Sequence, residues 1–286
     1  MAIKNVGVVG GGLMGSGIAQ TIAAAGYDVL LAEVDQALLD KGMDRVHGAW
    51  EMLVTKGKIT EAQAREFQER IRGTLKLEEF SDRDLVIEAI VENLEAKRTL
   101  FHTLDGIVKR EAILASNTSS LPIIEMAAVT GRQERVAGIH FFNPAPVMKL
   151  VEIVRTIATN DQTVAELHTF AGSLGKTPIV AKDTAGFVVN FLLIPYMLSA
   201  IRMYEHGLAT MEDIDTGMKL GCGYPMGPFE LLDYVGLDTT LYAAEAIYQE
   251  YPDPAYAPPT LLRRMVQAGR YGKKNGKGFY VGVEDQ

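Results

Sequence analysis

Cysteine is nearly missing from the sequence. The 286 residues contain one, Cys222, so no disulfide can form within the chain. This excludes the small secreted domains that depend on disulfides. The N-terminal residues also lack the apolar core and small-residue cleavage site of a secretory signal. We therefore expect a cytoplasmic protein.

A surplus of positive charge is also missing. Lys and Arg number 28 against 36 for Asp and Glu, a formal net charge of −8, whereas nucleic-acid-binding proteins usually carry a basic surplus. The stretch from Ala255 to Val283 is a local exception, because it contains basic residues and no acidic one. We interpret it as a solvated face or one that meets dinucleotide phosphates, and we expect no nucleic-acid partner.

Only one uncharged stretch is long enough to suggest a membrane span, between Asp183 and Arg202. Gly186, Asn190 and Pro195 interrupt it, so we predict a buried helix and no membrane partner. No set of His, Cys and Asp residues has metal-ligand spacing, and we expect no metal site. With 48% hydrophobic and 22% charged residues, the composition is typical of a folded globular protein and excludes a disordered chain.

Strand and helix patterns alternate over the first two-thirds of the chain, as in an α/β domain with a mainly parallel sheet. Residues 36 to about 73 have helical spacing, with a break at Gly57 and an N-cap at Thr60, which predicts a protruding helical hairpin. Apolar runs predict strands, and helical spacing predicts helices, at the following residues: strands at 6–10, 28–33, 85–88, 113–116, 136–140, 150–154 and 178–181, and helices at 13–25, 94–108 and 161–174.

After Asp183 the strand patterns stop. Helical patterns over 186–204, 211–219, 228–250 and 260–268 are separated by loops rich in Gly and Pro. We therefore predict two domains, an α/β domain over residues 1–184 and an all-helical domain over residues 185–286.

A glycine-rich turn joins the first predicted strand to the first predicted helix, and it matches G-x-G-x-x-G: Gly10-Gly11-Gly12-Leu13-Met14-Gly15. Gly10 permits the tight turn, Gly12 lets a pyrophosphate approach the backbone, and Gly15 lets the helix pack closely on the strand. The helix N-terminus at Leu13 and Met14 offers N–H groups to the phosphates. The pattern predicts a Rossmann-type nucleotide-binding domain; the alternative is a tight turn without a ligand.

Glu33 ends the second predicted strand, 18 residues after Gly15. An acid at this place can bind the ribose 2′-hydroxyl of the cofactor and repels a 2′-phosphate. We therefore predict NAD rather than NADP.

A histidine and a glutamate mark a second candidate site. His140 ends a predicted strand and leads into Asn143, and ligands of open α/β sheets bind beyond such strand ends. Glu152 lies inside the next apolar run, where a charge is costly unless it is paired. If adjacent strands bring Glu152 to the ring of His140, the carboxylate fixes the tautomer and favours the imidazolium. His140 would then act as a general base toward an alcohol; the alternative is a purely structural pair.

Two further polar residues are candidates. Ser119 lies at a strand end crowded with small hydrogen-bonding residues, where it either orients a substrate oxygen or belongs to an ordinary helix cap. Asn190 is polar on an otherwise apolar helix, and it is either a buried, satisfied amide or part of a site.

Together these segments resemble the short-chain L-3-hydroxyacyl-CoA dehydrogenase family, which includes bacterial 3-hydroxybutyryl-CoA dehydrogenases. The resemblance covers nearly the whole chain, and its most specific block runs from His140 to Glu152. It rests on residues 7–20, 85–89, 115–120, 140–152, 186–190, 224–228 and 276–280.

The family transfers a hydride between C3 of a 3-hydroxyacyl-CoA and NAD, so the resemblance implies an acyl-CoA substrate and a role in fatty acid metabolism. It implies that His140 is the base, that Glu152 is its partner, and that Ser119 and Asn190 hold substrate oxygens. It also implies a homodimer formed through the C-terminal helical domain. The cofactor contacts that it implies are Glu92, Lys97, Ser119, Asn143 and Lys274.

The chain departs from the family pattern in two places. Glu33 stands where the family usually has Asp, which keeps the charge and the NAD preference. Lys56 matches a family lysine that meets the CoA phosphates, but Met52 occupies what resembles another such position, with Lys58 nearby. We expect a modest loss of CoA affinity, because exposed ion pairs contribute only about 0–1 kcal/mol.

Three alternatives stay open at this point. The same scaffold is compatible with a dehydrogenase of a free 3-hydroxy acid. A dehydrogenase of the 3-hydroxyisobutyrate type would use a lysine in place of the pair of His140 and Glu152. A structural protein that only binds NAD would not need these side chains, although the sequence retains all of them.

Overall fold

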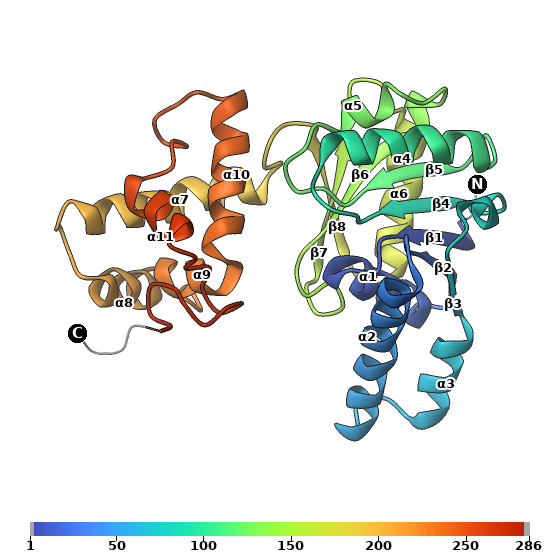
Figure 1. Cartoon of the computed structure of the whole chain (residues 1–286), viewed down its shortest axis with the longest axis horizontal. Helices are drawn as coiled ribbons and strands as arrows, with labels where there is room; N and C mark the ends of the chain where they lie inside the picture. The colour runs from blue at the N-terminus through green and yellow to red at the C-terminus, as the bar shows by residue number, and fades with distance from the viewer. Residues whose placement is uncertain (1–2, 283–286) are drawn as a thin grey trace. The chain divides into compact units, whose positions relative to one another are not determined.

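The computed structural model describes residues 3–282. The chain divides into two compact units, one ending at Asp183 and the other beginning at Thr184. Each unit has its own hydrophobic core (Figure 1).

The first unit is built on one eight-stranded sheet with the order β3-β2-β1-β4-β5-β6-β7-β8. All neighbouring strands are parallel except β6 and β7. This confirms the predicted Rossmann-type α/β class. The strands are β1 Asn5–Val9, β2 Asp28–Ala32, β3 Ile71–Thr74, β4 Leu85–Glu88, β5 Ile113–Ser116, β6 Val136–Phe141, β7 Leu150–Arg155 and β8 Thr177–Lys182.

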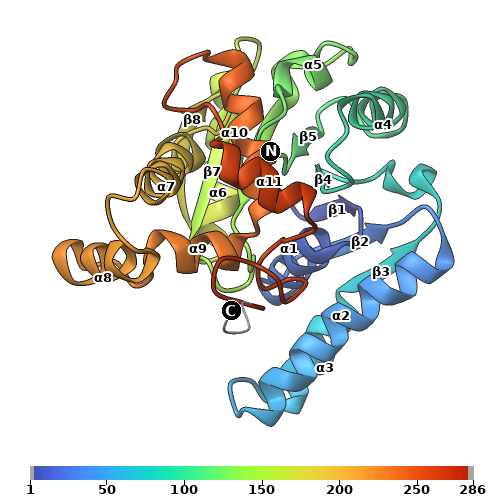
Figure 2. The same ribbon diagram turned by 60° about the vertical axis from the view of Figure 1, so that its left-hand side comes forward.

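Helices cover both faces of this sheet (Figures 1 and 2). Ile18 of α1 and Leu167 of α6 share one buried cluster with Ile139 of β6 and Ile153 of β7. Side chains alternate between the faces of a strand, so the neighbours of these two strand residues point to the opposite face, where α5 packs on β6. The helices are α1 Leu13–Ala24, α4 Leu94–Ile107, α5 Ile123–Ala127 and α6 Asp161–Ser173, with short 3₁₀ turns η1 Leu77–Phe80 and η2 Gln133–Arg135.

The predicted helical hairpin is present and extends away from the sheet (Figure 2). It consists of α2 Gln36–Thr55 and α3 Glu61–Glu69, and Thr60 caps α3 in a capping box with Gln63. The hairpin is shorter than predicted, because Ile71–Thr74 forms the edge strand β3 beside β2. The sequence of β3 has no apolar run that would indicate a strand. Only its two end residues are buried.

The second unit is helical, as predicted. One predicted helix over 228–250 is wrong, because it is two helices that meet at Gly236. This residue has φ +105°, a conformation that breaks a helix and favours glycine. The helices are α7 Val189–Glu205, α8 Met211–Cys222, α9 Pro228–Val235, α10 Leu237–Glu250 and α11 Thr260–Gln267. Within the described residues, no helix is both long enough and apolar enough to cross a membrane.

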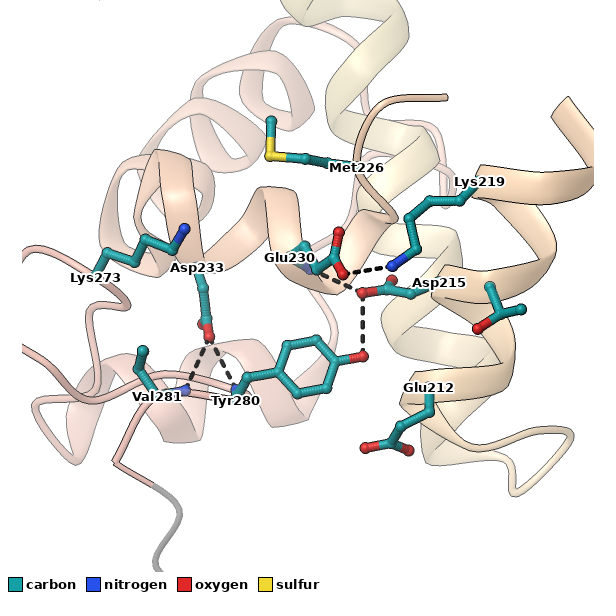
Figure 3. Close-up of a pocket in the computed structure, with 10 residues that line it drawn as sticks. Glu212, Asp215, Lys219, Met226, Glu230, Asp233, Lys273, Tyr280 and Val281 are labelled. Carbon is teal, nitrogen blue, oxygen red and sulfur yellow. Dashed lines mark hydrogen bonds and ion pairs between the residues drawn. The ribbon is translucent and has the colours of Figure 1, made fainter. Parts of the chain in front are cut away.

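Two buried carboxylates connect segments of the second unit (Figure 3). Asp215 accepts hydrogen bonds from the backbone N–H groups of Phe229 and Glu230 at the start of α9. Asp233 accepts the N–H groups of Phe279, at 2.7 Å, and Tyr280, at 2.9 Å. Both side chains border a hollow of about 530 Å³, and both are engaged by the protein itself.

The glycine-rich C-terminal segment wraps closely around Asp233. A Cβ atom at Gly278 would lie 2.0 Å from the carboxylate, and one at Gly272 would lie 2.4 Å from the Asp233 carbonyl oxygen. These positions accept no side chain without displacement of the chain, which explains why glycines recur there.

We predict that Asp233→Ala lowers the free energy of unfolding by about 3 kcal/mol, because it leaves buried N–H groups without an acceptor. Chemical denaturation followed by circular dichroism measures this change. Asp253→Ala, at an exposed turn, is the control and should stay within about 1 kcal/mol of the parent. Equal stabilities of the two variants would contradict the structural role of Asp233.

Candidate active site

The glycine-rich turn has the geometry of a phosphate-binding loop. Gly10 has φ +101°, and a Cβ atom there would lie 2.6 Å from the Ala89 carbonyl oxygen. A Cβ atom at Gly15 would lie 1.7 Å from the Gly10 carbonyl oxygen, so the helix packs on the turn with no room to spare. At Gly12 a Cβ atom would meet no other atom within 4 Å, which leaves the backbone open to a ligand.

The start of α1 is suited to bind an anion. Gly12 is the N-cap residue, and no side chain in the described chain caps this helix. Gly12 and Leu13 are exposed and Met14 is partly buried. Exposed N–H groups at a helix N-terminus bind phosphate, so the residues present fit a dinucleotide.

Glu33 lies just beyond β2 and is fastened to the turn. Its carboxylate accepts the Gly11 N–H at 2.6 Å and the Val34 N–H at 3.1 Å. From the other side, Arg45 of α2 donates to the Gly11 carbonyl oxygen at 3.0 Å. The acidic group therefore lies directly beside the glycine-rich turn.

His140 and Glu152 lie opposite each other on the antiparallel strands β6 and β7. The imidazole Nδ1 and the carboxylate Oε2 are 2.7 Å apart. His140 is 6% exposed and Glu152 is fully buried, while the Phe142 ring lies 4.6 Å from the imidazole ring. The structure therefore forms the pair that the sequence analysis made conditional on strand pairing.

Two side chains fix the surroundings of this pair, and neither was singled out from the sequence. Asn117 accepts the Phe141 N–H at 2.9 Å, which ties the end of β5 to the end of β6. Lys176 donates to the carbonyl oxygens of Ala145, at 2.6 Å, and Met148, at 2.8 Å. Burial lowers the pKa of Lys176, as does the nearby charge of Lys149. A charged residue next to an apolar strand was the only sequence signal for Lys176.

Ser119, Glu92 and Lys97 gather at the ends of β4 and β5. Lys97 Nζ lies 3.1 Å from Glu92 Oε2, and Glu92 Oε1 accepts the Ser119 N–H at 3.3 Å. Lys97 is buried, whereas Glu92 and Ser119 are partly exposed. Asn143 is exposed in the loop that follows β6.

The remaining candidates lie farther from this group in the chain. Lys56 and Met52 are both exposed at the end of α2, one helical turn apart, and Lys58 is exposed in the loop that follows. In the second unit, Asn190 is partly buried in the first turn of α7. Lys274 forms an ion pair with Asp238 of α10.

No group of three or more His, Cys, Asp and Glu side chains suited to a metal ion occurs among residues 3–282. Within the first unit, the glycine-rich turn, Glu33, His140 and the group of Ser119, Glu92 and Lys97 lie near the carboxyl ends of β1, β2, β4, β5 and β6. This fold and site define an NAD-dependent dehydrogenase class, in which a nucleotide lies across the strand ends of an open sheet.

Comparisons with known proteins agree with this class. Residues 5–184 match the NAD-binding domain of 3-hydroxyacyl-CoA dehydrogenases, and residues 186–282 match the C-terminal domain of the same enzymes. The chain belongs to the 3-hydroxyacyl-CoA dehydrogenase family, and its cofactor is NAD.

Three relatives illustrate the similarity. The chain is 49% identical to 3-hydroxybutyryl-CoA dehydrogenase from Mycobacterium tuberculosis, over 98% of this chain and 99% of the relative. It is 47% identical to human mitochondrial hydroxyacyl-coenzyme A dehydrogenase, over 97% and 91% of the two chains. The crystal structure of (S)-3-hydroxybutyryl-CoA dehydrogenase PaaH1 from Ralstonia eutropha matches with a TM-score of 0.95 and 44% identity, over 99% and 100% of the two chains.

We predict opposite patterns for two glycine variants of the turn. Gly12→Ala should leave the thermal midpoint unchanged but weaken NADH binding about tenfold, since its methyl group meets only the ligand. Gly15→Ala should lower stability by about 1–3 kcal/mol, because its methyl group collides with the Gly10 carbonyl. Differential scanning fluorimetry and NADH fluorescence titration measure the two effects. NADH binding at full strength by Gly12→Ala would rule out phosphate approach at this residue.

Proposed function

We propose that the protein interconverts (S)-3-hydroxyacyl-CoA and 3-oxoacyl-CoA, with the short-chain 3-hydroxybutyryl-CoA as its substrate, and that His140 and Glu152 form the general acid–base dyad. The observation that carries this proposal is the 2.7 Å contact between His140 and the buried Glu152, at the strand ends of an NAD-binding domain. The names of the relatives support the same substrate class.

The hydrogen bond assigns roles to the two ring nitrogens of His140. An ionised carboxylate only accepts hydrogen bonds, so Nδ1 of His140 donates to Glu152, and Nε2 is the nitrogen that exchanges a proton with substrate. The buried negative charge stabilises the imidazolium that forms when Nε2 takes the proton of the 3-hydroxyl group.

When bound, NAD accepts the hydride that leaves C3 of the alcohol. The hydroxyl proton passes to Nε2 of His140, and C3 becomes a carbonyl carbon. In the reductive direction His140 returns this proton to the developing alkoxide, and Ser119 and Asn190 donate hydrogen bonds to the substrate oxygen.

We assign the other predicted residues by the same proposal. Gly10, Gly12, Leu13, Met14 and Gly15 bind the pyrophosphate, and Glu33 binds the adenosine ribose. Asn143 lies by the nicotinamide, and the other assigned cofactor contacts are Glu92, Lys97, Ser119 and Lys274. Lys56 meets the CoA phosphates from the exposed end of α2.

The proposal extends to organisation and location. Residues 1–184 form the NAD-binding domain, and residues 185–286 form a domain that contributes to substrate binding and joins two chains in a homodimer. The enzyme works in the cytoplasm, on acyl-CoA substrates of fatty acid metabolism.

The first experiment mixes the purified protein with NADH and acetoacetyl-CoA and follows the loss of NADH absorbance. Fast oxidation is expected with this pair, and little is expected with NADPH or with free acetoacetate. Equal activity on free acetoacetate would favour the alternative, a dehydrogenase of a free 3-hydroxy acid.

We predict that His140→Ala lowers kcat by about 10²–10⁴, the usual contribution of a general acid–base group. Glu152→Gln should keep the pocket shape but lower kcat most in the neutral range, because the imidazolium loses its stabilising charge. His168→Ala, at an exposed histidine of α6, is the matched control and should retain parental kcat. Full activity of Glu152→Gln between pH 5 and 8, the range in which histidine titrates, would exclude the dyad.

We predict that Lys56→Ala raises KM for acetoacetyl-CoA about threefold, with kcat unchanged, since an exposed ion pair contributes at most about 1 kcal/mol. Steady-state kinetics at low and high ionic strength measure the effect, which salt should reduce. Lys4→Ala, at an exposed lysine before β1, is the control. An equal rise of KM in both variants would show that Lys56 does not meet CoA.

A further inference from the structure

A closed ring of hydrogen bonds connects five side chains at the ends of β4 and β5. Ser116 Oγ donates to Glu88 Oε2 at 2.6 Å, and Lys97 Nζ donates to Glu88 Oε1 at 2.5 Å. Lys97 Nζ also lies 3.1 Å from Glu92 Oε2, and the Thr118 hydroxyl donates to Glu92 Oε1. The Thr118 N–H donates to Ser116 Oγ at 3.1 Å and closes the ring.

Glu88 is the anchor of this ring. It is fully buried and lies directly beside Ser116 in the sheet register. Its carboxylate also accepts the Ile90 N–H at 2.7 Å, so it receives three hydrogen bonds. Three hydrogen bonds hold this buried carboxylate in one orientation.

The ring lies at the point where the strand order reverses. The chain runs outward from β1 to β3 and then returns to place β4 on the other side of β1, and open α/β sheets bind nucleotides at such a point. Among the three charged members, Glu88 and Lys97 have side chains only 1% exposed, whereas Glu92 is 29% exposed. Glu92 is thus the charged member that faces outward.

The charges of Lys97, Glu88 and Glu92 explain how Glu88 acts on the ring. The Lys97 ammonium lies between two carboxylates, and a buried ammonium needs a buried counter-charge to stay ionised in a fixed place. Without Glu88, Glu92 would be the only carboxylate left to pair with this ammonium. With Glu88 in place, the ammonium is neutralised from within, and Glu92 keeps its outward orientation beside Ser119.

We propose that Glu88 is a positioning residue for the cofactor site: it fixes the Lys97 ammonium and, through the ring, sets the orientation of Glu92 toward NAD. This inference rests on the proposed contacts of Glu92 and Lys97 with the cofactor. It assigns no contact with the cofactor to Glu88 itself.

The test compares Glu88→Gln with Asp84→Asn, a matched variant just before β4, at the opposite end of the same strand. Asp84 is also a buried carboxylate, 9% exposed, that accepts two backbone N–H groups and pairs with a lysine, Lys109. Thermal unfolding identifies a temperature at which both variants are fully folded, and NADH fluorescence titration is carried out there.

We expect Glu88→Gln to weaken NADH binding about tenfold, which corresponds to the loss of one charge-assisted hydrogen bond. KM for NADH should rise with it. KM for acetoacetyl-CoA should stay within about twofold, which corresponds to about 0.4 kcal/mol. Asp84→Asn should bind NADH like the parent even if it is equally destabilised. Parental NADH affinity in Glu88→Gln, or an equal loss in both variants, would overturn the proposal.

If Glu88→Gln does not fold, Ser116→Ala tests the same ring, because it removes a hydroxyl group and leaves every charge in place. A weaker NADH affinity of this variant, with an unchanged KM for acetoacetyl-CoA, would support the ring, and an unchanged NADH affinity would refute it. The binding titration needs no turnover, so an inactive parent protein would refute the proposed reaction without affecting this comparison.

Discussion

The pairing of a buried carboxylate with an imidazole is the interaction on which the site depends. Glu152 lies fully buried inside a strand, where an unpaired charge would be prohibitively costly. The antiparallel register of β6 and β7 supplies its partner, because it puts His140 directly opposite. The loop between the two strands joins them as a hairpin, and Lys176 holds this loop in place. The same pairing that satisfies the fold also fixes the orientation of the imidazole.

Parallel strands explain why the other polar groups gather where they do. Carboxyl ends of parallel strands share one edge of the sheet, so Gly10 after β1, Glu33 after β2, Glu88 in β4 and Ser116 in β5 come to that edge together. Each group is then held by hydrogen bonds to its neighbours rather than by its own segment. The turn is fastened by Glu33, and the end of β5 by Glu88.

Carboxylates of the same kind serve different purposes in the two units. In the second unit Asp215 and Asp233 are nearly as buried as Glu152, and their oxygens accept backbone N–H groups of the unit itself and, at Asp215, the Tyr280 hydroxyl. They hold the start of α9 and the glycine-rich C-terminal segment in place. Burial alone therefore does not separate these carboxylates from Glu152; what differs is the partner, since Glu152 lies 2.7 Å from an imidazole nitrogen.

The local features of this protein could be predicted from its sequence: the α/β and helical classes, the glycine-rich turn, the cap at Thr60 and most element bounds. These depend on residues close together in the chain, whose periodicity and turn chemistry are visible in the sequence. It did not determine the edge strand Ile71–Thr74 or the helix break at Gly236, since both follow from neighbours and backbone angles that no pattern records. The contact of His140 with Glu152 and the contacts of Glu88 with Lys97 and Ser116 become visible only in the folded chain. Such contacts depend on strand order and register, which are set by packing over the whole sheet.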